Sequence, residues 1–112
     1  MNVKNALGAS CAIALILAGI SIAAATAPEV GIHIFQFRPG QLEVKAGTRV
    51  TWTNQDEITH TVTSGTPEQR DGRFDQRLEG RGAAATVELT TPGVYPYFCG
   101  RHPSMRGEIR VN

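Results

Sequence analysis

From Val30 onward the chain is a series of short runs in which apolar and polar residues alternate, separated by turns rich in Gly, Pro and Asn. This alternation is typical of strands that place one face on a core and the other in water. It is clearest in three pairs, each with a polar residue between its members: Leu42 and Val44, Val50 and Trp52, and Ile109 and Val111. We predict seven strands, over residues 30–37, 41–45, 48–54, 58–64, 84–89, 94–99 and 107–111.

Seven short strands in fewer than ninety residues, with no long helical stretch, predict an all-β sandwich rather than a βαβ fold. One segment, residues 65–82, breaks the pattern, because four arginines alternate there with four acidic residues. We interpret it as a solvated excursion of the chain, that is, a solvent-exposed loop. One helical turn that carries Phe74 and Leu78, four residues apart, would hold this loop against the sandwich. An alternative is a docking surface for an acidic partner.

The N-terminal segment has the three parts of a secretory signal. No charged residue lies between Lys4 and Glu29, residues 12–22 are apolar, and small residues follow at 23–25. We expect residues 1–25 to be a signal peptide that is cleaved after Ala25, which leaves residues 26–112 as a single periplasmic domain. The alternative is an uncleaved membrane anchor, because the apolar stretch 6–25 is just long enough to span a bilayer.

Composition excludes several classes of function. The chain has 112 residues, too few for a multidomain enzyme with a large substrate cavity. Its 11 basic residues nearly balance its 10 acidic ones, whereas a nucleic-acid binder normally has a basic excess. Cleavage would remove Cys11 and leave Cys99 as the one thiol, which cannot form an internal disulfide in an oxidising compartment. The residues around Cys99 must decide its role.

Those residues suggest metal chemistry. Cys99, His102 and Met105 follow one another at three-residue intervals, directly after one predicted strand and before the next. A loop of that length can fold the three side chains around one point. Soft sulfur donors favour copper(I), while imidazole also accepts copper(II), so this set of donors indicates copper.

A fourth ligand has to come from elsewhere, and His60 is the best candidate. On the predicted strand 58–64, His60 shares its parity with Ile58 and Val62, so it should point inward with them. A buried imidazole needs a partner. Two histidines, one cysteine and a weak axial methionine are the ligands of a blue-copper electron-transfer site.

Three stretches of the chain together resemble the cupredoxin family. The C-x-x-H-x-x-M spacing is most similar to that of its amicyanin and plastocyanin-like members. The stretches read F-Q-F-R-P-G-Q-L-E-V-K-A-G-T-R-V-T-W-T-N-Q-D, then H-T-V-T-S, then P-G-V-Y-P-Y-F-C-G-R-H-P-S-M-R-G-E-I-R-V. The resemblance implies a cupredoxin-like Greek-key β-sandwich of seven to eight strands, with copper held by His60, Cys99, His102 and Met105.

The resemblance also implies a function: a small exported blue copper protein that carries single electrons between redox partners, such as a c-type cytochrome or a dehydrogenase. We expect a monomer that is not an enzyme, does not bind nucleic acid and does not insert its mature domain into a membrane. The alternative is a periplasmic copper-binding or delivery protein without redox cycling. A hydrolase in which Cys99 and His102 act as nucleophile and base is a third possibility, but the chain offers little for a substrate cleft.

Two positions depart from the family pattern. Thr61 follows the first ligand histidine, where related proteins commonly have Asn, and its hydroxyl is expected to tie the His60 strand to the ligand loop. Leu89 stands where Phe is common, which we interpret as a change in packing only.

The resemblance further implies that the loop histidine lies near the surface at the end of the sandwich and that electrons pass through its surroundings. A patch of small or rigid residues is expected there, flanked by Arg101 and Arg106, which favour an acidic rim on the partner. Its expected members are Pro39, Gly100, Pro103 and Ser104. His33 is interpreted as a half-exposed strand residue outside the site, and Trp52, Tyr95 and Tyr97 as core or strand residues.

Overall fold

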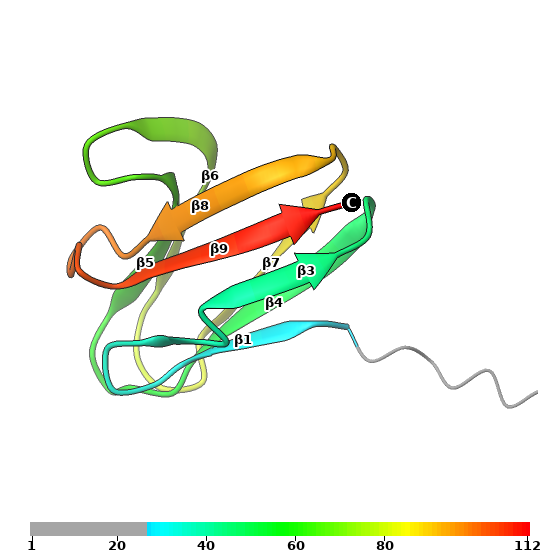
Figure 1. The fold of residues 1–112 in the computed structure, drawn as a ribbon. Coiled ribbons are helices and arrows are strands. Elements are labelled where there is room, and N and C mark those ends of the chain that lie inside the picture. The colour runs from blue at the N-terminus through cyan, green and yellow to red at the C-terminus, as the bar shows by residue number, and fades with distance from the viewer. Residues whose placement is uncertain (1–26) are drawn as a thin grey trace, which may run out of the picture.

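The computed structural model of the chain describes residues 27–112, which form nine strands in two facing sheets (Figure 1). The predicted signal peptide, residues 1–25, and Cys11 lie outside the described residues. None of residues 27–112 forms a helix long and apolar enough to cross a membrane. The strands are β1 (Glu29–Ile32), β2 (Phe37–Arg38), β3 (Gln41–Val44), β4 (Thr48–Asn54), β5 (His60–Gly65), β6 (Arg70–Leu78), β7 (Ala84–Leu89), β8 (Gly93–Phe98) and β9 (Arg106–Val111).

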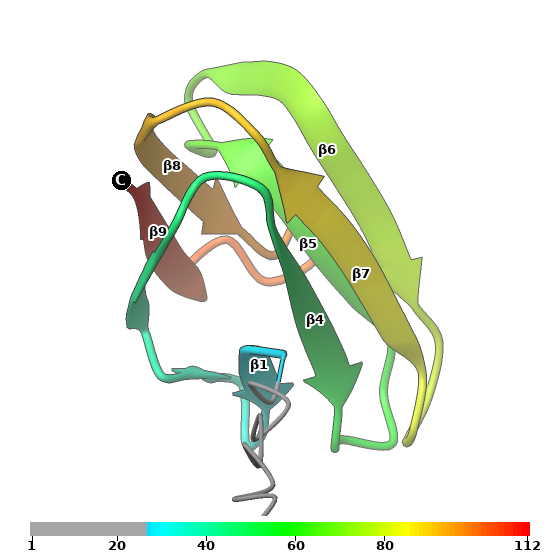
Figure 2. The ribbon, with the colours of Figure 1, turned by 90° about the vertical axis from the view of Figure 1, so that its right-hand side faces the viewer.

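The chain passes repeatedly between the two sheets (Figure 2). One sheet has the order β2-β1-β4-β7 and the other has the order β3-β9-β8-β5-β6. Two pairs are parallel, β1 with β4 and β3 with β9, and the remaining pairs are antiparallel. The predicted β-sandwich is therefore confirmed, with nine strands where seven to eight were expected.

The core lies between the sheets and contains the residues that the alternation marks. Val50, Trp52 and Ile109 are fully buried, whereas Leu42 at the edge strand β3 is only partly covered. Trp52 packs edge-on against the ring of Tyr97, with ring centroids 5.4 Å apart. Trp52, Tyr95 and Tyr97 are thus core residues, as the sequence predicts.

The predicted strand 30–37 is wrong in its middle, where the chain turns back on itself between β1 and β2. His33 and Gln36 exchange backbone hydrogen bonds of 3.0 and 3.2 Å around a two-residue turn. Ile34 and Phe35 have φ values of 49° and 58°, in the left-handed region that costs a non-glycine residue about 1–2 kcal/mol. Such turns usually contain Asn or Gly, and this one contains neither, so no residue type in the segment indicates a turn.

The charged segment 65–82 also differs from its prediction, because it contains the long strand β6 rather than a solvated excursion with a helical turn. β6 pairs antiparallel with β5 and buries Phe74 and Leu78 while its other residues are exposed. Residues four apart lie on one face both of a helix and of a strand, so the spacing of this pair does not distinguish the two.

Tyr97 is 1% exposed, and its hydroxyl has no hydrogen-bond partner among residues 27–112. Burial raises the pKa of Tyr97 to about 12, against about 10 in an unfolded chain. Because the folded pKa is raised, this group contributes stability below pH 10 that is lost as the pH rises to 12. Up to about 2–3 kcal/mol is at stake, at about 1.4 kcal/mol per pKa unit.

We expect Tyr97→Phe to change the free energy of unfolding little at pH 8, because it removes an unpaired buried hydroxyl. Between pH 10 and 12 the variant should lose less stability than the parent protein. Urea unfolding curves at several pH values measure the difference. A Tyr95→Phe variant is the control, since the Tyr95 hydroxyl donates a hydrogen bond to the carbonyl of Thr91. Parallel loss of stability in Tyr97→Phe and the parent would contradict the prediction.

Candidate metal centre

His60 is the first residue of β5, and its side chain is fully buried. The prediction that it points inward is confirmed, although Ile58, expected on the same strand, lies before it in the connection and is 42% exposed. Buried Asn54 holds this connection: its amide donates to the carbonyls of Ile58 and Leu78, and its side-chain oxygen accepts from the backbone N–H of Asp56. The end of β4 therefore fixes where β5 begins.

The loop between β8 and β9 positions the other three predicted ligands. The N–H of Cys99 donates to the carbonyl of Met105 at 3.0 Å. Within the loop that this hydrogen bond closes, the N–H of His102 donates to the carbonyl of Cys99, and the N–H of Met105 donates to the carbonyl of His102. The three-residue spacing in the sequence thus corresponds to successive tight turns, each closed by a backbone hydrogen bond between ligand candidates.

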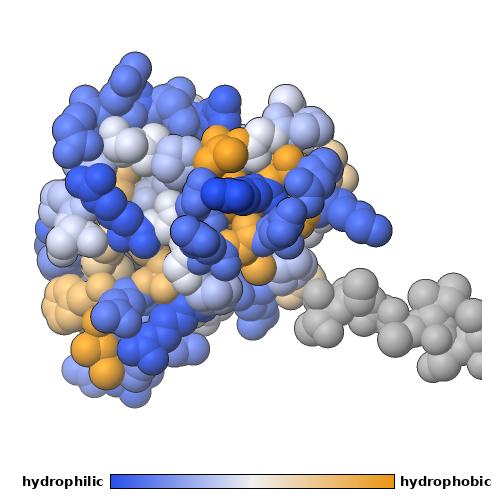
Figure 3. Space-filling model, in the orientation of Figure 1, coloured by the Kyte–Doolittle hydropathy of each residue, from blue (hydrophilic) through white to orange (hydrophobic). Residues whose placement is uncertain are grey.

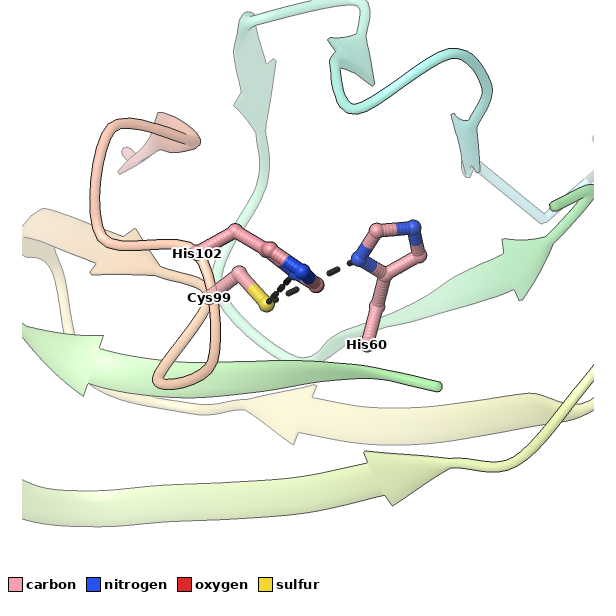
Figure 4. Close-up of side chains that lie close together, drawn as sticks. All are labelled: His60, Cys99 and His102. Carbon is pink, nitrogen blue, oxygen red and sulfur yellow. Dashed lines mark hydrogen bonds between the residues drawn. The ribbon is translucent and has the colours of Figure 1, made fainter. Parts of the chain in front are cut away.

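Three donor atoms meet where this loop faces β5 (Figure 4). The Sγ of Cys99 lies 3.7 Å from Nδ1 of His60 and 3.6 Å from Nδ1 of His102, and the three atoms lie within 4.8 Å of one another. Metal–nitrogen and metal–sulfur bonds of about 2.0 and 2.3 Å give a tetrahedral N···S edge of roughly 3.5 Å. The donor atoms therefore fit around one metal ion.

Met105 lies on the same loop, and its side chain is 3% exposed. Its backbone is bonded to both loop ligand candidates, as described above, so it is held beside them. The residues offer a thiolate, two imidazoles and a buried thioether. This combination suits copper and lacks the oxygen donors that Mg²⁺ or Ca²⁺ prefers.

Thr61 connects β5 to the ligand loop, as its position next to His60 predicts. The N–H of Gly100 donates to the Thr61 hydroxyl at 2.6 Å, and the N–H of Thr61 points at the sulfur of Cys99 at 3.3 Å. The Thr63 hydroxyl donates to Asp75, so the Thr61 hydroxyl must donate to Thr63. This chain of hydrogen bonds fixes the sulfur from the β5 side.

Asp56 and Phe35 also belong to the site, although neither is predicted from the sequence. Oδ2 of Asp56 lies 2.8 Å from Nε2 of His60. The ring of Phe35 packs edge-on against both imidazoles, with centroids 5.4 Å from His60 and 5.0 Å from His102. Asp56 precedes His60 in an irregular connection, where no periodicity reveals contacts, and Phe35 lay inside a predicted strand.

Charge around the site follows from these contacts. Burial alone would raise the pKa of Asp56, but hydrogen bonds from the N–H groups of Ile34 and Phe35 and from His60 outweigh it and lower that pKa. Desolvation, with the nearby His60 and Arg101, lowers the pKa of His102. A neutral imidazole is the form that binds metal, so this shift favours binding near neutral pH.

The remaining predicted positions lie apart from the donor cluster. His33 is exposed in the β1–β2 turn, with its Nδ1 3.9 Å from Oδ1 of Asp56, and it is not among the clustered ligands. Leu89 ends β7 and is 3% exposed, so it belongs to the core. Arg106 forms an ion pair with Glu68 at 3.4 Å, whereas Arg101 is exposed and belongs to no ion pair found within residues 27–112.

Comparisons with known proteins agree with this geometry. Residues 24–112 match the family described as copper binding proteins, plastocyanin/azurin family. Amicyanin-alpha of Methylorubrum extorquens is 34% identical over 95% of this chain and 92% of its own length. A purple cupredoxin from Nitrosopumilus maritimus superposes with a TM-score of 0.70 at 26% identity, covering 76% of this chain and 99% of its own.

A crystal structure of amicyanin from Paracoccus versutus superposes with a TM-score of 0.67 at 28% identity, covering 79% of this chain and 83% of its own. The predicted resemblance to cupredoxins, and to their amicyanin and plastocyanin-like members, is confirmed. This chain belongs to the plastocyanin/azurin family of copper-binding proteins, and its cofactor is copper.

Proposed function

We propose that this protein is an electron carrier in which His60, Cys99, His102 and Met105 bind one copper ion as a type 1 site. One observation supports the ligand assignment above all: Nδ1 of His60, Sγ of Cys99 and Nδ1 of His102 converge within 4.8 Å in a closed, hydrogen-bonded setting. The protein is a small blue copper protein that transfers one electron at a time between redox partners, and it is not an enzyme.

The copper ion, when bound, supplies the one-electron couple between copper(I) and copper(II). The chain keeps its ligands in place in both states. Cys99, His102 and Met105 are joined by backbone hydrogen bonds, and Thr61 ties the sulfur to β5. Because these bonds connect protein groups to one another, a change in the charge of the ion requires little movement of the ligands.

Electrons enter and leave at the end of the sandwich that carries the β8–β9 loop and the β1–β2 turn (Figure 1). His102 is partly exposed there. Ile34 and Phe35 are 63% and 48% exposed, and Figure 3 shows an apolar area at this end of the molecule. Partners therefore dock against this turn together with the expected patch around Pro103, which places them close to the His102 ring.

The protein works outside the cytoplasm. Residues 1–25 direct export and are removed, and residues 26–112 form the single periplasmic domain, which is a monomer. Its donor and acceptor are redox proteins, such as a dehydrogenase and a c-type cytochrome. The apolar composition of residues 6–25 and the small residues at 23–25 support this assignment.

Expression of the full chain in a Gram-negative host tests these points together. We expect periplasmic protein with an N-terminus at Thr26, measured by mass spectrometry. One equivalent of copper(II) should give an intense blue band and a small copper hyperfine splitting, bleached by ascorbate and restored by a mild oxidant. A pale spectrum with ordinary splitting would contradict the ligand set and favour copper binding without redox cycling.

A separate prediction concerns Arg101, the exposed rim arginine that forms no ion pair with another of residues 27–112. We expect Arg101→Glu to slow oxidation of the reduced protein by the anionic oxidant hexacyanoferrate(III), most strongly at low ionic strength, because the local field that attracts anions is reversed. Stopped-flow rates at several salt concentrations measure this effect. Arg49→Glu, at the start of β4, is the control for net charge. Equal rates in both variants would remove Arg101 from the docking surface.

A further inference from the structure

Asp56 joins two parts of the site, the ring of His60 and the Ile34–Phe35 turn. Its Oδ2 lies 2.8 Å from Nε2 of His60 and accepts a hydrogen bond from the N–H of Phe35 at 3.2 Å. Its Oδ1 accepts a hydrogen bond from the N–H of Ile34 at 2.8 Å. Only 14% of its side chain is exposed. We propose that Asp56 is a positioning residue that sets the ligand form and redox balance of His60 and fastens the Ile34–Phe35 turn over the same ligand.

The first step concerns the imidazole. An ionised carboxylate only accepts hydrogen bonds, so Nε2 of His60 must carry the proton that lies between them. Nδ1 is then unprotonated, and Nδ1 is the atom that faces the sulfur of Cys99. A carboxylate that accepts a hydrogen bond from the second ring nitrogen of a metal-binding histidine orients the imidazole and raises its basicity. Loss of such a carboxylate typically weakens metal binding about 10–100-fold.

The second step concerns the turn. Ile34 and Phe35 both have left-handed backbone, and their two N–H groups point at one carboxylate. That anchor holds the Phe35 ring edge-on against His60 and His102. The groups that face Asp56 are therefore one copper ligand, the backbone of the turn at the partner-facing end, and the ring of His33, whose Nδ1 lies 3.9 Å away.

The third step concerns charge. A largely buried negative charge hydrogen-bonded to a ligand favours copper(II), the more positive state, over copper(I). Asparagine has one acceptor oxygen instead of two, so Asp56→Asn both removes this charge and leaves one of the N–H groups facing the amide without an acceptor. This inference rests on the proposed role of His60 as a copper ligand.

The test compares Asp56→Asn with Glu57→Gln, which removes the same charge one residue away on a side chain that is 84% exposed. In copper-loaded full-length protein, we expect Asp56→Asn to reduce the ratio of copper(II) to copper(I) affinity about tenfold, which raises the reduction potential by about 59 mV. Glu57→Gln should leave the potential close to that of the parent. Equal potentials in the two variants, measured by voltammetry, would overturn the proposal.

A second measurement uses copper-free parent protein and so depends neither on the variant's folding nor on copper binding. Nitrogen-15 spectra at pH 8 should show His60 protonated at Nε2, and the amides of Ile34 and Phe35 should exchange slowly with solvent. A proton at Nδ1 of His60, or rapid exchange of both amides, would overturn the proposal. Absence of a blue band in the copper-loaded parent protein would instead overturn the proposed ligand set. The Asp56 contacts would then be tested by the nitrogen-15 spectra and amide exchange of the copper-free protein alone.

Discussion

Cys99→Ser is expected to abolish the intense blue band of the copper-loaded protein and to leave, at most, the pale spectrum of an oxygen- and nitrogen-bound copper(II) ion. Cys99 is the proposed thiolate ligand, and its Sγ lies 3.6–3.7 Å from Nδ1 of both histidines. A serine hydroxyl stays protonated near neutral pH and is a poor ligand for soft copper(I). The affinity for copper(I) should therefore fall more than that for copper(II), and the reduction potential should decrease.

The fold should survive this change, which separates loss of the ligand from loss of structure. Serine matches cysteine in shape, and its oxygen can accept the N–H of Thr61 that now points at the sulfur. Met105→Leu is the matched control, because it removes the other loop sulfur but keeps the thiolate, so its protein should remain strongly coloured. Visible spectra of both copper-loaded variants and urea unfolding of both copper-free variants measure the two effects. A blue Cys99→Ser protein would show that the thiolate is not a ligand.

The second large effect is expected at Gly65, the last residue of β5, where Gly65→Ala should destabilise the fold by about 2–5 kcal/mol. Gly65 has φ +101°, and an added Cβ would press on the carbonyl oxygen of Gln69 and lie 2.8 Å from Cα of Arg70. Left-handed strain contributes about 1–2 kcal/mol and overpacking about 1–3 kcal/mol. The colliding atoms are backbone atoms of the β5–β6 turn, so they cannot rotate away.

Gly72→Ala separates these two contributions. Gly72 lies in β6 with φ +73°, and no atom of the described residues lies within 4 Å of the position of an added Cβ. This variant should therefore lose only the conformational part, about 1–2 kcal/mol. Urea unfolding midpoints of the two copper-free variants provide the comparison. If the free energy of unfolding of Gly65→Ala were equal to or higher than that of Gly72→Ala, the close approach of the turn would not explain the glycine at position 65.

The sequence predicts the site better than it predicts the chain around the site. Cys99, His102 and Met105 could be singled out as candidate ligands because their chemistry is rare and their spacing fits one loop. His60 could be identified because an imidazole on the apolar face of a strand needs a partner. These inferences depend on residue type and local periodicity, which are visible in a single sequence.

The missed features depend instead on contacts between distant residues. The β1–β2 turn contains no residue that favours left-handed backbone, and Asp56, more than twenty residues away, supplies acceptors to both of its central N–H groups. β6 was missed because its charged face resembles a solvated loop, and its pairing with β5 is what makes it a strand. Neither feature has a signal within its own segment.

The parallel pairing of β3 with β9 bears on when the protein acquires its metal. β9 is the last of the strands within residues 27–112, and it lies between β3 and β8, so residue 41 meets its partner only when residue 108 is present. The β8–β9 loop is anchored on that same strand. On the proposed export route, a chain still threading through a channel would lack β9, and therefore neither the sandwich nor the ligand loop could close. Copper uptake would then follow the proposed export, and the metal would come from the compartment in which the protein works.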